Sequence, residues 1–198
     1  MIIGITGGTG CGKTTLLEVI RQLGGVVLDC DAIYHRLVQE DSKLLDAIDA
    51  RFPGCVEQGV LQRKKLGSIV FADKAALEDL NKITHSAIKQ EVIRLLTPAP
   101  KLAAIDAIAL FESGLNELCK LTVAVTAPED VRVARLMARD GISRQYAESR
   151  IAAQKPQSYF SSLCDYTLEN TGTREEFRDK CLAFFRNPAI IEEKTKEC

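Results

Sequence analysis

A lysine and a threonine end a glycine-rich run near the N-terminus, and their spacing is typical of a phosphate-binding loop. The run Gly7-Gly8-Thr9-Gly10-Cys11-Gly12-Lys13-Thr14 fits the pattern GxxxxGK[ST], follows an apolar run and opens a helical pattern. Glycines let backbone N–H groups and the helix N-terminus surround phosphate oxygens. A plain glycine-rich turn would explain neither Lys13 nor Thr14. The predicted nucleotide-binding residues of the loop are Gly8, Thr9, Gly10, Cys11, Gly12, Lys13, Thr14 and Thr15.

Within this loop we expect the Lys13 ammonium to reach the β- and γ-phosphates and the Thr14 hydroxyl to bind Mg²⁺. The loop alone does not identify the reaction. A GTPase needs NKxD and DxxG segments, but Asn81–Thr84 lacks the aspartate and the chain has no DxxG. A kinase of small molecules brings its second substrate to the carboxyl ends of the strands. We therefore favour a kinase over a non-catalytic nucleotide switch or adaptor.

Three carboxylates follow strand-like runs and are candidates for the site. Asp31 follows the second run and could orient or deprotonate an acceptor hydroxyl; the alternative, that it only caps the next helix, is equally compatible with its position. Asp106 ends a Walker-B-like run, Leu102–Asp106, and could hold Mg²⁺ through water. Glu112 follows in a loop, as a site residue or an ordinary loop carboxylate.

Basic residues gather in two further places. Arg135 and Arg139 are four residues apart on one helix face, and Arg144 and Arg150 follow. Such a group is usually a solvated face, but opposite a phosphate loop it could neutralise the transferring phosphoryl group. Arg63, Lys64 and Lys65 suit phosphates on an acceptor. The histidines are His35 and His85, and a lone histidine more often packs or hydrogen-bonds than catalyses.

Five short apolar runs predict the strands of a parallel sheet covered on both faces. Helical patterns separate these runs, which predicts an α/β fold. Between the second and third runs lie about 70 residues without a good strand signal, where 41–52, 63–71 and 74–96 are predicted helices. We expect this stretch to form a helical lobe over one end of the sheet. The expected strands are Ile2–Thr6, Val26–Asp29, Leu102–Leu110, Leu121–Thr126 and Tyr166–Leu168.

Length and composition are those of an ordinary globular protein. The 198 residues are 46% hydrophobic and 27% charged, with a net charge of −1. This balance argues against a bulk nucleic-acid or acidic-membrane binder, so we expect neither partner. Seven scattered cysteines without a CxxC pair predict a reduced, cytoplasmic protein, and the N-terminus lacks the basic region of a signal peptide. We expect a monomer or a weak homo-oligomer.

Taken in order, these segments resemble the dephospho-coenzyme A kinase family almost end to end. Residues 3–15 resemble its glycine loop and 27–31 its IDAD segment, in which the second aspartate is taken as catalytic. Residues 61–71 are similar to DRxxLxxxVF, 80–85 to LNxxxHP, and 106–112 to DxPLLFE. Residues 135–139, 150–154 and 165–170 resemble the lid and the adenine-side segment. Three departures remove no group that does chemistry: Gln62 replaces an acidic or Asn residue, and Ser86 and Ile108 each replace a proline.

The resemblance implies a P-loop kinase with a five-stranded parallel sheet that uses ATP and Mg²⁺ to phosphorylate the 3′-hydroxyl of dephospho-coenzyme A. A nucleoside or nucleoside-monophosphate kinase is the alternative. The implied catalytic residues are Asp31, Lys13, Arg135 and Arg139; Asn170 and Gly172 lie beside adenine. Substrate would contact Asp31, Arg63, Lys64, His85 and Glu112, and the metal Thr14 and Asp106. The expected division is a core (1–30, 98–134, 163–198), a lobe (31–97) and a lid (135–162).

Overall fold

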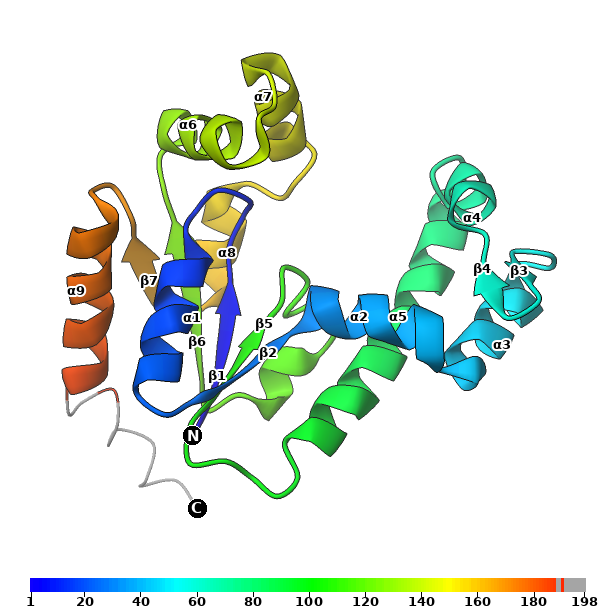
Figure 1. The fold of residues 1–198 in the computed structure, drawn as a ribbon, viewed down its shortest axis with the longest axis horizontal. Coiled ribbons are helices and arrows are strands. Elements are labelled where there is room, and N and C mark those ends of the chain that lie inside the picture. Colours follow the sequence, from blue (N-terminus) through cyan, green and yellow to red (C-terminus); the bar gives the residue numbers. More distant parts are fainter. Residues whose placement is uncertain (188–189, 191–198) are drawn as a thin grey trace.

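The computed structural model describes residues 1–187 and 190, and its centre is a five-stranded sheet whose neighbouring strands are all parallel (Figure 1). The strand order is β2-β5-β1-β6-β7. This confirms the predicted parallel sheet. Residues 188–189 and 191–198, assigned to the core from the sequence, lie outside the described residues. The strands are β1 (Ile2–Thr6), β2 (Val26–Asp29), β5 (Ala103–Asp106), β6 (Leu121–Thr126) and β7 (Tyr166–Glu169).

One face of the sheet is covered by the helix that follows the glycine loop and by the last helix (Figure 1). Ile3 and Ile5 of β1 are fully buried there against Leu16 and Ile20, which recur at helical spacing. Because these apolar side chains leave water together, their burial holds the loop's helix against the strand that precedes it. The two helices are α1 (Lys13–Gln22) and α9 (Arg174–Arg186).

The chain after β5 differs from its prediction. The expected strand Leu102–Leu110 is paired only over Ala103–Asp106, and turns follow. Leu110 is fully buried, beside Gly4 of β1. The run is apolar beyond the strand because its later residues pack beneath the sheet, not because they join it. Periodicity alone does not separate these two cases. A short 3₁₀ helix, η1 (Leu115–Leu118), completes this segment.

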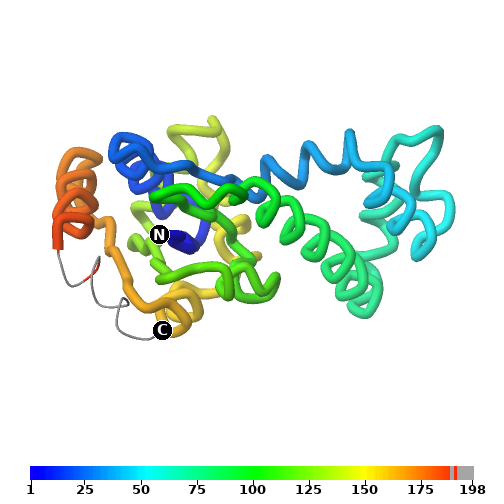
Figure 2. The backbone as a smooth tube through the Cα atoms, turned by 90° about the horizontal axis from the view of Figure 1, so that it is seen from below, coloured from blue at the N-terminus to red at the C-terminus, as the bar shows by residue number. Residues whose placement is uncertain are grey.

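A lobe of four helices extends from the edge of the sheet at β2 and β5 (Figure 2). Its three predicted helices are present with slightly shorter bounds. A two-stranded hairpin between them was not predicted: its strands are two residues each, and Gln58 and Gly59 at its turn both have positive φ. Strands this short carry no recognisable alternation. The elements are α2 (Cys30–Glu40), α3 (Ser42–Arg51), β3 (Val56–Glu57), β4 (Val60–Leu61), α4 (Arg63–Val70) and α5 (Lys74–Leu95).

Two helices stand above the glycine loop, and a third leads back to the sheet (Figure 1). A small apolar cluster that includes Leu136 and Ile151 joins α6 (Glu129–Asp140) to α7 (Arg144–Ala152). Helix α6 runs without interruption across 134–135, the expected start of the lid, while α8 (Gln157–Leu163) packs beside β6. Of the helices in the described part of the chain, none is both long and apolar enough to cross a membrane.

Candidate active site

The carboxyl ends of the central strands open into a cavity of about 740 Å³ between the glycine loop, the start of α2 and the helices above. Parallel strands bring their carboxyl ends to one edge, so residues far apart in sequence meet there. Eleven residues that line this cavity are site residues predicted from the sequence or adjoin one of them. Ile108, Leu136, Ala138, Arg150 and Gln154 complete the lining. The eleven are Gly8, Thr9, Gly10, Gly12, Lys13, Thr14, Asp29, Asp31, Asp106, Arg135 and Arg139.

The glycine loop has the form that its sequence predicts. Gly12 caps α1 with a left-handed backbone (φ 90°), and the helix begins at Lys13. The Lys13 ammonium donates to the Gly7 carbonyl at 2.7 Å, and the Thr14 side chain is exposed at the cavity. A lysine folded back over a loop of this shape can transfer its ammonium from a carbonyl to phosphate oxygens. Cys11 and Thr15 are buried behind the loop and do not line the cavity.

Asp29, not Asp31, caps α2. The Asp29 carboxylate accepts hydrogen bonds from the backbone N–H groups of Asp31 and Ala32, each at 3.0 Å. The capping alternative for Asp31 is therefore wrong, because its neighbour already does that work. The Asp31 side chain is exposed on the first turn of the helix and lines the cavity. It is free to meet a second substrate.

Asp106, at the end of β5, is a buried carboxylate whose charge is poorly balanced by its surroundings. Its Oδ1 is buried and has no hydrogen-bond partner. Burial, together with the nearby charges of Asp29 and Asp31, raises the pKa of this carboxyl to about 6, although Lys13 opposes the shift. The register of the sheet sets Asp106 level with Asp29 on the next strand. A cation at this edge would satisfy the orphaned oxygen and offset the three acids.

These residues fit Mg²⁺ bound together with a nucleotide. Within residues 1–187, no three His, Cys, Asp or Glu side chains are arranged to hold a metal unaided. Mg²⁺ usually binds through one or two carboxylates together with substrate phosphates and water, so a lone buried Asp106 oxygen and the Thr14 hydroxyl suit it.

Arg135 of α6 ties the glycine loop to the end of β7. Its Nη2 donates to the Asn170 side-chain oxygen at 2.9 Å, while Nη1 lies 3.4 Å from the carbonyl oxygens of Gly10 and Cys11. Asn170, almost fully buried, in turn donates to the Cys11 carbonyl at 2.9 Å. A Cβ at Gly12 would stand 2.2 Å from the Asn170 amide nitrogen, so this close approach requires glycine. Gly172 joins through its carbonyl, 3.4 Å from Arg135.

Arg139 and Arg150 converge on one acid. Arg139 donates twice to Asp140, at 2.6 and 2.9 Å, and Arg150 donates to it at 2.6 Å. These two arginines hold the pKa of Asp140 well below its usual range. Both also line the cavity, so two guanidinium groups face it together. Arg144 points elsewhere and pairs with Glu148 along α7.

A second cavity, of about 310 Å³, adjoins the first and lies between α2, α5 and the turns after β5. Asp31 lines both cavities. Tyr34 and His85 line the second one, whose wall is mostly apolar. Burial lowers the pKa of His85, although a hydrogen bond to the Glu112 backbone and the charge of Glu112 oppose this shift. The imidazole is therefore neutral near pH 7.

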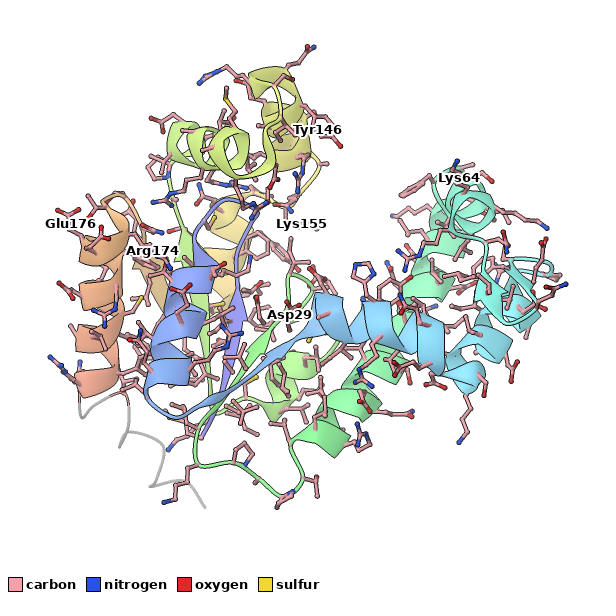
Figure 3. All side chains as sticks on the ribbon, viewed as in Figure 1. Asp29, Lys64, Tyr146, Lys155, Arg174 and Glu176 are labelled. Atoms are coloured by element: carbon pink, nitrogen blue, oxygen red, sulfur yellow. The ribbon has the colours of Figure 1, made fainter. Side chains whose placement is uncertain are left out.

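Three expected substrate residues lie outside both cavities. The Glu112 carboxylate accepts a hydrogen bond from the Tyr159 hydroxyl at 2.9 Å. Arg63 lies at the start of α4 with its Nη2 3.4 Å from His35 Nδ1. Lys64 is exposed at the upper end of the lobe, apart from Asp29 at the start of α2 (Figure 3). Lys65, from the same basic run, donates to the Gly54 carbonyl.

Sequence reasoning missed Arg132, Gln154 and Tyr159. Arg132 is 3% exposed although it is charged, and its Nε donates to the Thr9 carbonyl at 2.9 Å. Gln154 Oε1 accepts from the Thr9 N–H at 2.8 Å. One signal was available in the sequence: Arg132 stands beside Val133 and three residues after Glu129, on the face of the helix that turns inward. A charged residue there is buried only if it has a specific partner.

The chain matches known proteins over most of its length. The family model for dephospho-CoA kinase matches residues 1–176. A dephospho-CoA kinase from Anaeromyxobacter dehalogenans is 38% identical over 90% of this chain and 88% of its own. One from Syntrophotalea carbinolica is 36% identical over 92% of this chain and 90% of its own.

Solved structures agree with this assignment. A crystal structure from Thermus thermophilus has a TM-score of 0.78 and 33% identity, covering 98% of both chains. Dephospho-CoA kinase from Campylobacter jejuni has a TM-score of 0.66 and 26% identity, covering 93% of this chain and 95% of that one. A shikimate kinase from Acinetobacter baumannii, at 17% identity and a TM-score of 0.52, shares the fold of a P-loop kinase. Sequence, fold and site geometry agree: this chain belongs to the dephospho-CoA kinase family.

Proposed function

We propose that this protein transfers the γ-phosphoryl group of ATP to the 3′-hydroxyl of dephospho-CoA, giving CoA and ADP. The observation that carries the proposal is that Asp31 lines both the cavity at the glycine loop and the adjoining cavity of the lobe. A carboxylate at that junction can touch an acceptor hydroxyl while the donor phosphates occupy the loop. Membership of the family supports dephospho-CoA as the acceptor.

In this proposal the donor is held from the loop. Lys13 leaves the Gly7 carbonyl for the β- and γ-phosphates, and the loop amides surround the β-phosphate. Thr14 and Asp106 would hold Mg²⁺, which would offset the charge of the phosphates. Asn170 and Gly172 lie at the opposite end of the loop, where Arg135 joins them, and we assign adenine to that side.

The transfer itself needs the acceptor oxygen in line with the γ-phosphorus. Asp31 accepts the hydroxyl proton as the bond between the acceptor oxygen and phosphorus forms. The bond between the γ-phosphorus and the β,γ-bridging oxygen breaks, and its electron pair leaves with ADP. Charge spreads over the equatorial oxygens as this happens, and we assign its stabilisation to Arg135 and Arg139, which line the cavity together with Arg150.

The acceptor side of the proposal uses the lobe. His85, neutral and in the wall of the second cavity, can hydrogen-bond the bound molecule. Arg63 and Lys64 lie farther along the lobe, where they would meet the acceptor's diphosphate after the lobe approaches the core. Glu112 acts through its bond to Tyr159. We retain the division into core, lobe (31–97) and lid (135–162) as part of this proposal.

Coupled ADP release tests the function. The purified chain is assayed with ATP, Mg²⁺ and one acceptor at a time: dephospho-CoA, several nucleosides and several nucleoside monophosphates. The proposal expects kcat/KM to be highest for dephospho-CoA. Preference for a nucleoside or a nucleotide would instead support the alternative kinase, and ATP binding with no turnover on any acceptor would support a nucleotide switch.

A further inference from the structure

One residue of the glycine loop, Thr9, has both of its backbone polar groups hydrogen-bonded to side chains from the segments above. The Thr9 N–H donates to Gln154 Oε1 at 2.8 Å, and the Thr9 carbonyl accepts from Arg132 Nε at 2.9 Å. Arg132 belongs to α6, and Gln154 follows the end of α7. The two side chains therefore come from segments more than 20 residues apart in the sequence and meet at one loop residue.

The glycine loop packs closely against α6 and Gln154 on both sides of Thr9. A Cβ at Gly8 would stand 2.5 Å from Arg132 Nη2 and 3.1 Å from Gln154 Oε1, so the same two side chains contact the loop one residue earlier. On the other side, a Cβ at Gly10 would stand 2.9 to 3.1 Å from the backbone and Cβ of Arg132. The loop thus lies directly on α6 from Gly8 to Gly10. Side chains larger than hydrogen at either glycine would push it away.

Burial makes the arginine's bond costly to lose. Arg132 is 3% exposed, and its Nη2 is buried without a hydrogen-bond partner. A buried guanidinium is retained only where its remaining bonds are strong. With its N–H and carbonyl both engaged, the Thr9 backbone has nothing left to offer a phosphate. Its part is to anchor the loop, and binding the phosphates would be left to the amides that follow.

We propose that Arg132 and Gln154 are positioning residues that fix the backbone on both sides of Thr9 and thereby hold the following amides of the glycine loop toward the β-phosphate of the nucleotide. The inference rests on the nucleotide role of the loop proposed above. It gives Gln154 a second effect, because this residue also lines the cavity and comes from the lid region. Movement of that region would then alter the phosphate-binding surface directly.

Nucleotide binding without any acceptor tests the inference. The affinities of the purified chain for ATP, ADP and AMP are measured by calorimetry for wild type and Gln154→Ala. Loss of the bond to Thr9 should weaken ATP and ADP about 10-fold, the size of a single lost hydrogen bond to a buried group, and leave AMP unchanged because AMP has no β-phosphate. Unchanged ATP affinity, or equal weakening of AMP, would overturn the proposal.

The chain provides a matched control. Gln157 Oε1 accepts from the Ala127 N–H at 2.7 Å, an equivalent bond at a residue that does not line the cavity. Gln157→Ala should lower Tm and leave all three nucleotide affinities unchanged. If Gln157→Ala weakened ATP and ADP as much as Gln154→Ala does, the effect would be general loosening and the proposal would be wrong.

Two substitutions at Arg132 supply a rescue test. Gln places an N–H donor the same number of bonds from Cα as the arginine Nε, whereas Met fills that volume without a donor. Arg132→Gln should bind ATP nearly as wild type does, and Arg132→Met should lose about 10-fold. Equal behaviour of the two would contradict the role of the Thr9 bond. If Arg132→Met fails to fold, Gln154→Ala decides. Failure of dephospho-CoA to be phosphorylated would leave these binding results untouched.

Discussion

The carboxylate of Asp29 accepts the backbone N–H of Asp31 at 3.0 Å, so the first acid of this pair fixes the backbone of the second. The division of work is physical. The carboxylate of an aspartate that caps a helix accepts hydrogen bonds from backbone N–H groups, whereas a carboxylate on the first turn can bind other partners. Two acids separated by one residue therefore act in different ways, and substitutions should separate them.

Asp31→Asn should lower kcat by about 10²–10⁴-fold, the usual contribution of a general base, while the affinity for ATP changes little. The amide keeps the size of the side chain but does not accept the hydroxyl proton. Steady-state kinetics with saturating ATP, together with ATP titration, measure both quantities. As a contrast, Asp29→Ala should destabilise the protein by about 1 kcal/mol through loss of the cap, and Asp29→Asn should not. Full activity in Asp31→Asn would remove this residue from the reaction.

Lys13→Ala should abolish turnover and change Tm little. The Lys13 ammonium makes one hydrogen bond within the protein, to the Gly7 carbonyl, but would neutralise charge on the transferring phosphoryl group. ADP release and thermal melts measure the two effects. Lys74→Ala is the control, because that side chain is 91% exposed. Its ion pair with Glu78, four residues on, contributes little to stability at the surface. Near wild-type turnover for Lys13→Ala at saturating ATP would exclude the loop as the donor site.

Asp106 should make the nucleotide-free protein less stable as pH rises. Its pKa is raised to about 6 in the folded state, above the value of about 4 in an unfolded chain. Its contribution to stability is therefore complete below pH ~4 and is lost as pH rises through ~6. Asp106→Asn removes this loss, so the variant should gain Tm over wild type at pH 8 and show no gain at pH 3.5. Melts across this range measure the difference, and a gain of equal size at both pH values would contradict the buried carboxylate.

We expect ADP release to depend on Mg²⁺, and Asp106 to contribute to binding this ion. We expect EDTA to abolish ADP release and excess Mg²⁺ to restore it. Asp106→Asn should need more Mg²⁺ for half-maximal rate, because an amide is a weaker ligand than a carboxylate. An unchanged Mg²⁺ requirement would show that Asp106 does not contribute to metal binding.

Arg135 and Arg139 of α6 should behave differently from each other in stability and alike in catalysis. Both Arg135→Ala and Arg139→Ala should lower kcat by about 10²-fold or more, since charge on the phosphoryl group develops mainly in the transition state. Arg135→Ala should also lower Tm, because it frees the buried Asn170. Arg139→Ala should leave stability within about 0.5 kcal/mol, as its bonds are to exposed Asp140.

Lysine at either position should restore only part of the rate, because a point charge does not reproduce the planar fork of guanidinium. Arg144→Ala is the control, because this side chain is exposed and pairs with Glu148 along α7. Wild-type kcat in the Arg135 and Arg139 variants would leave α6 an ordinary structural helix.

Much of the fold could be predicted because its signals are local. Continuous apolar runs identify β1, β2 and β6, and the glycine pattern identifies the loop and the helix it opens. What escaped prediction depends on contacts between distant segments. Leu110 is apolar because it packs beside Gly4, and the hairpin at residues 56–61 exists through pairing of two-residue strands. Neither leaves a periodic trace in the sequence.

The site divides in the same way. Residues on the glycine loop and at the strand ends were found because parallel topology brings strand ends together. Arg132 and Gln154 were missed because their importance lies in bonds to Thr9, more than 120 residues away along the chain. For Asp31, the sequence left capping and catalysis open, and only the hydrogen bonds of Asp29 excluded capping.

The meeting of the two cavities at Asp31 and Ile108 has a consequence for how acceptor preference can change. The wall of the second cavity comes from α2, α5 and the turns after β5, and no glycine-loop residue belongs to it. Substitutions at Tyr34, Leu80 or Ile88 can therefore reshape the pocket for a different alcohol without disturbing the groups around the donor phosphates. The molecule is modular in this respect: the glycine loop holds the phosphate donor, whereas helices of the lobe and the turns after β5 form the wall that selects the acceptor.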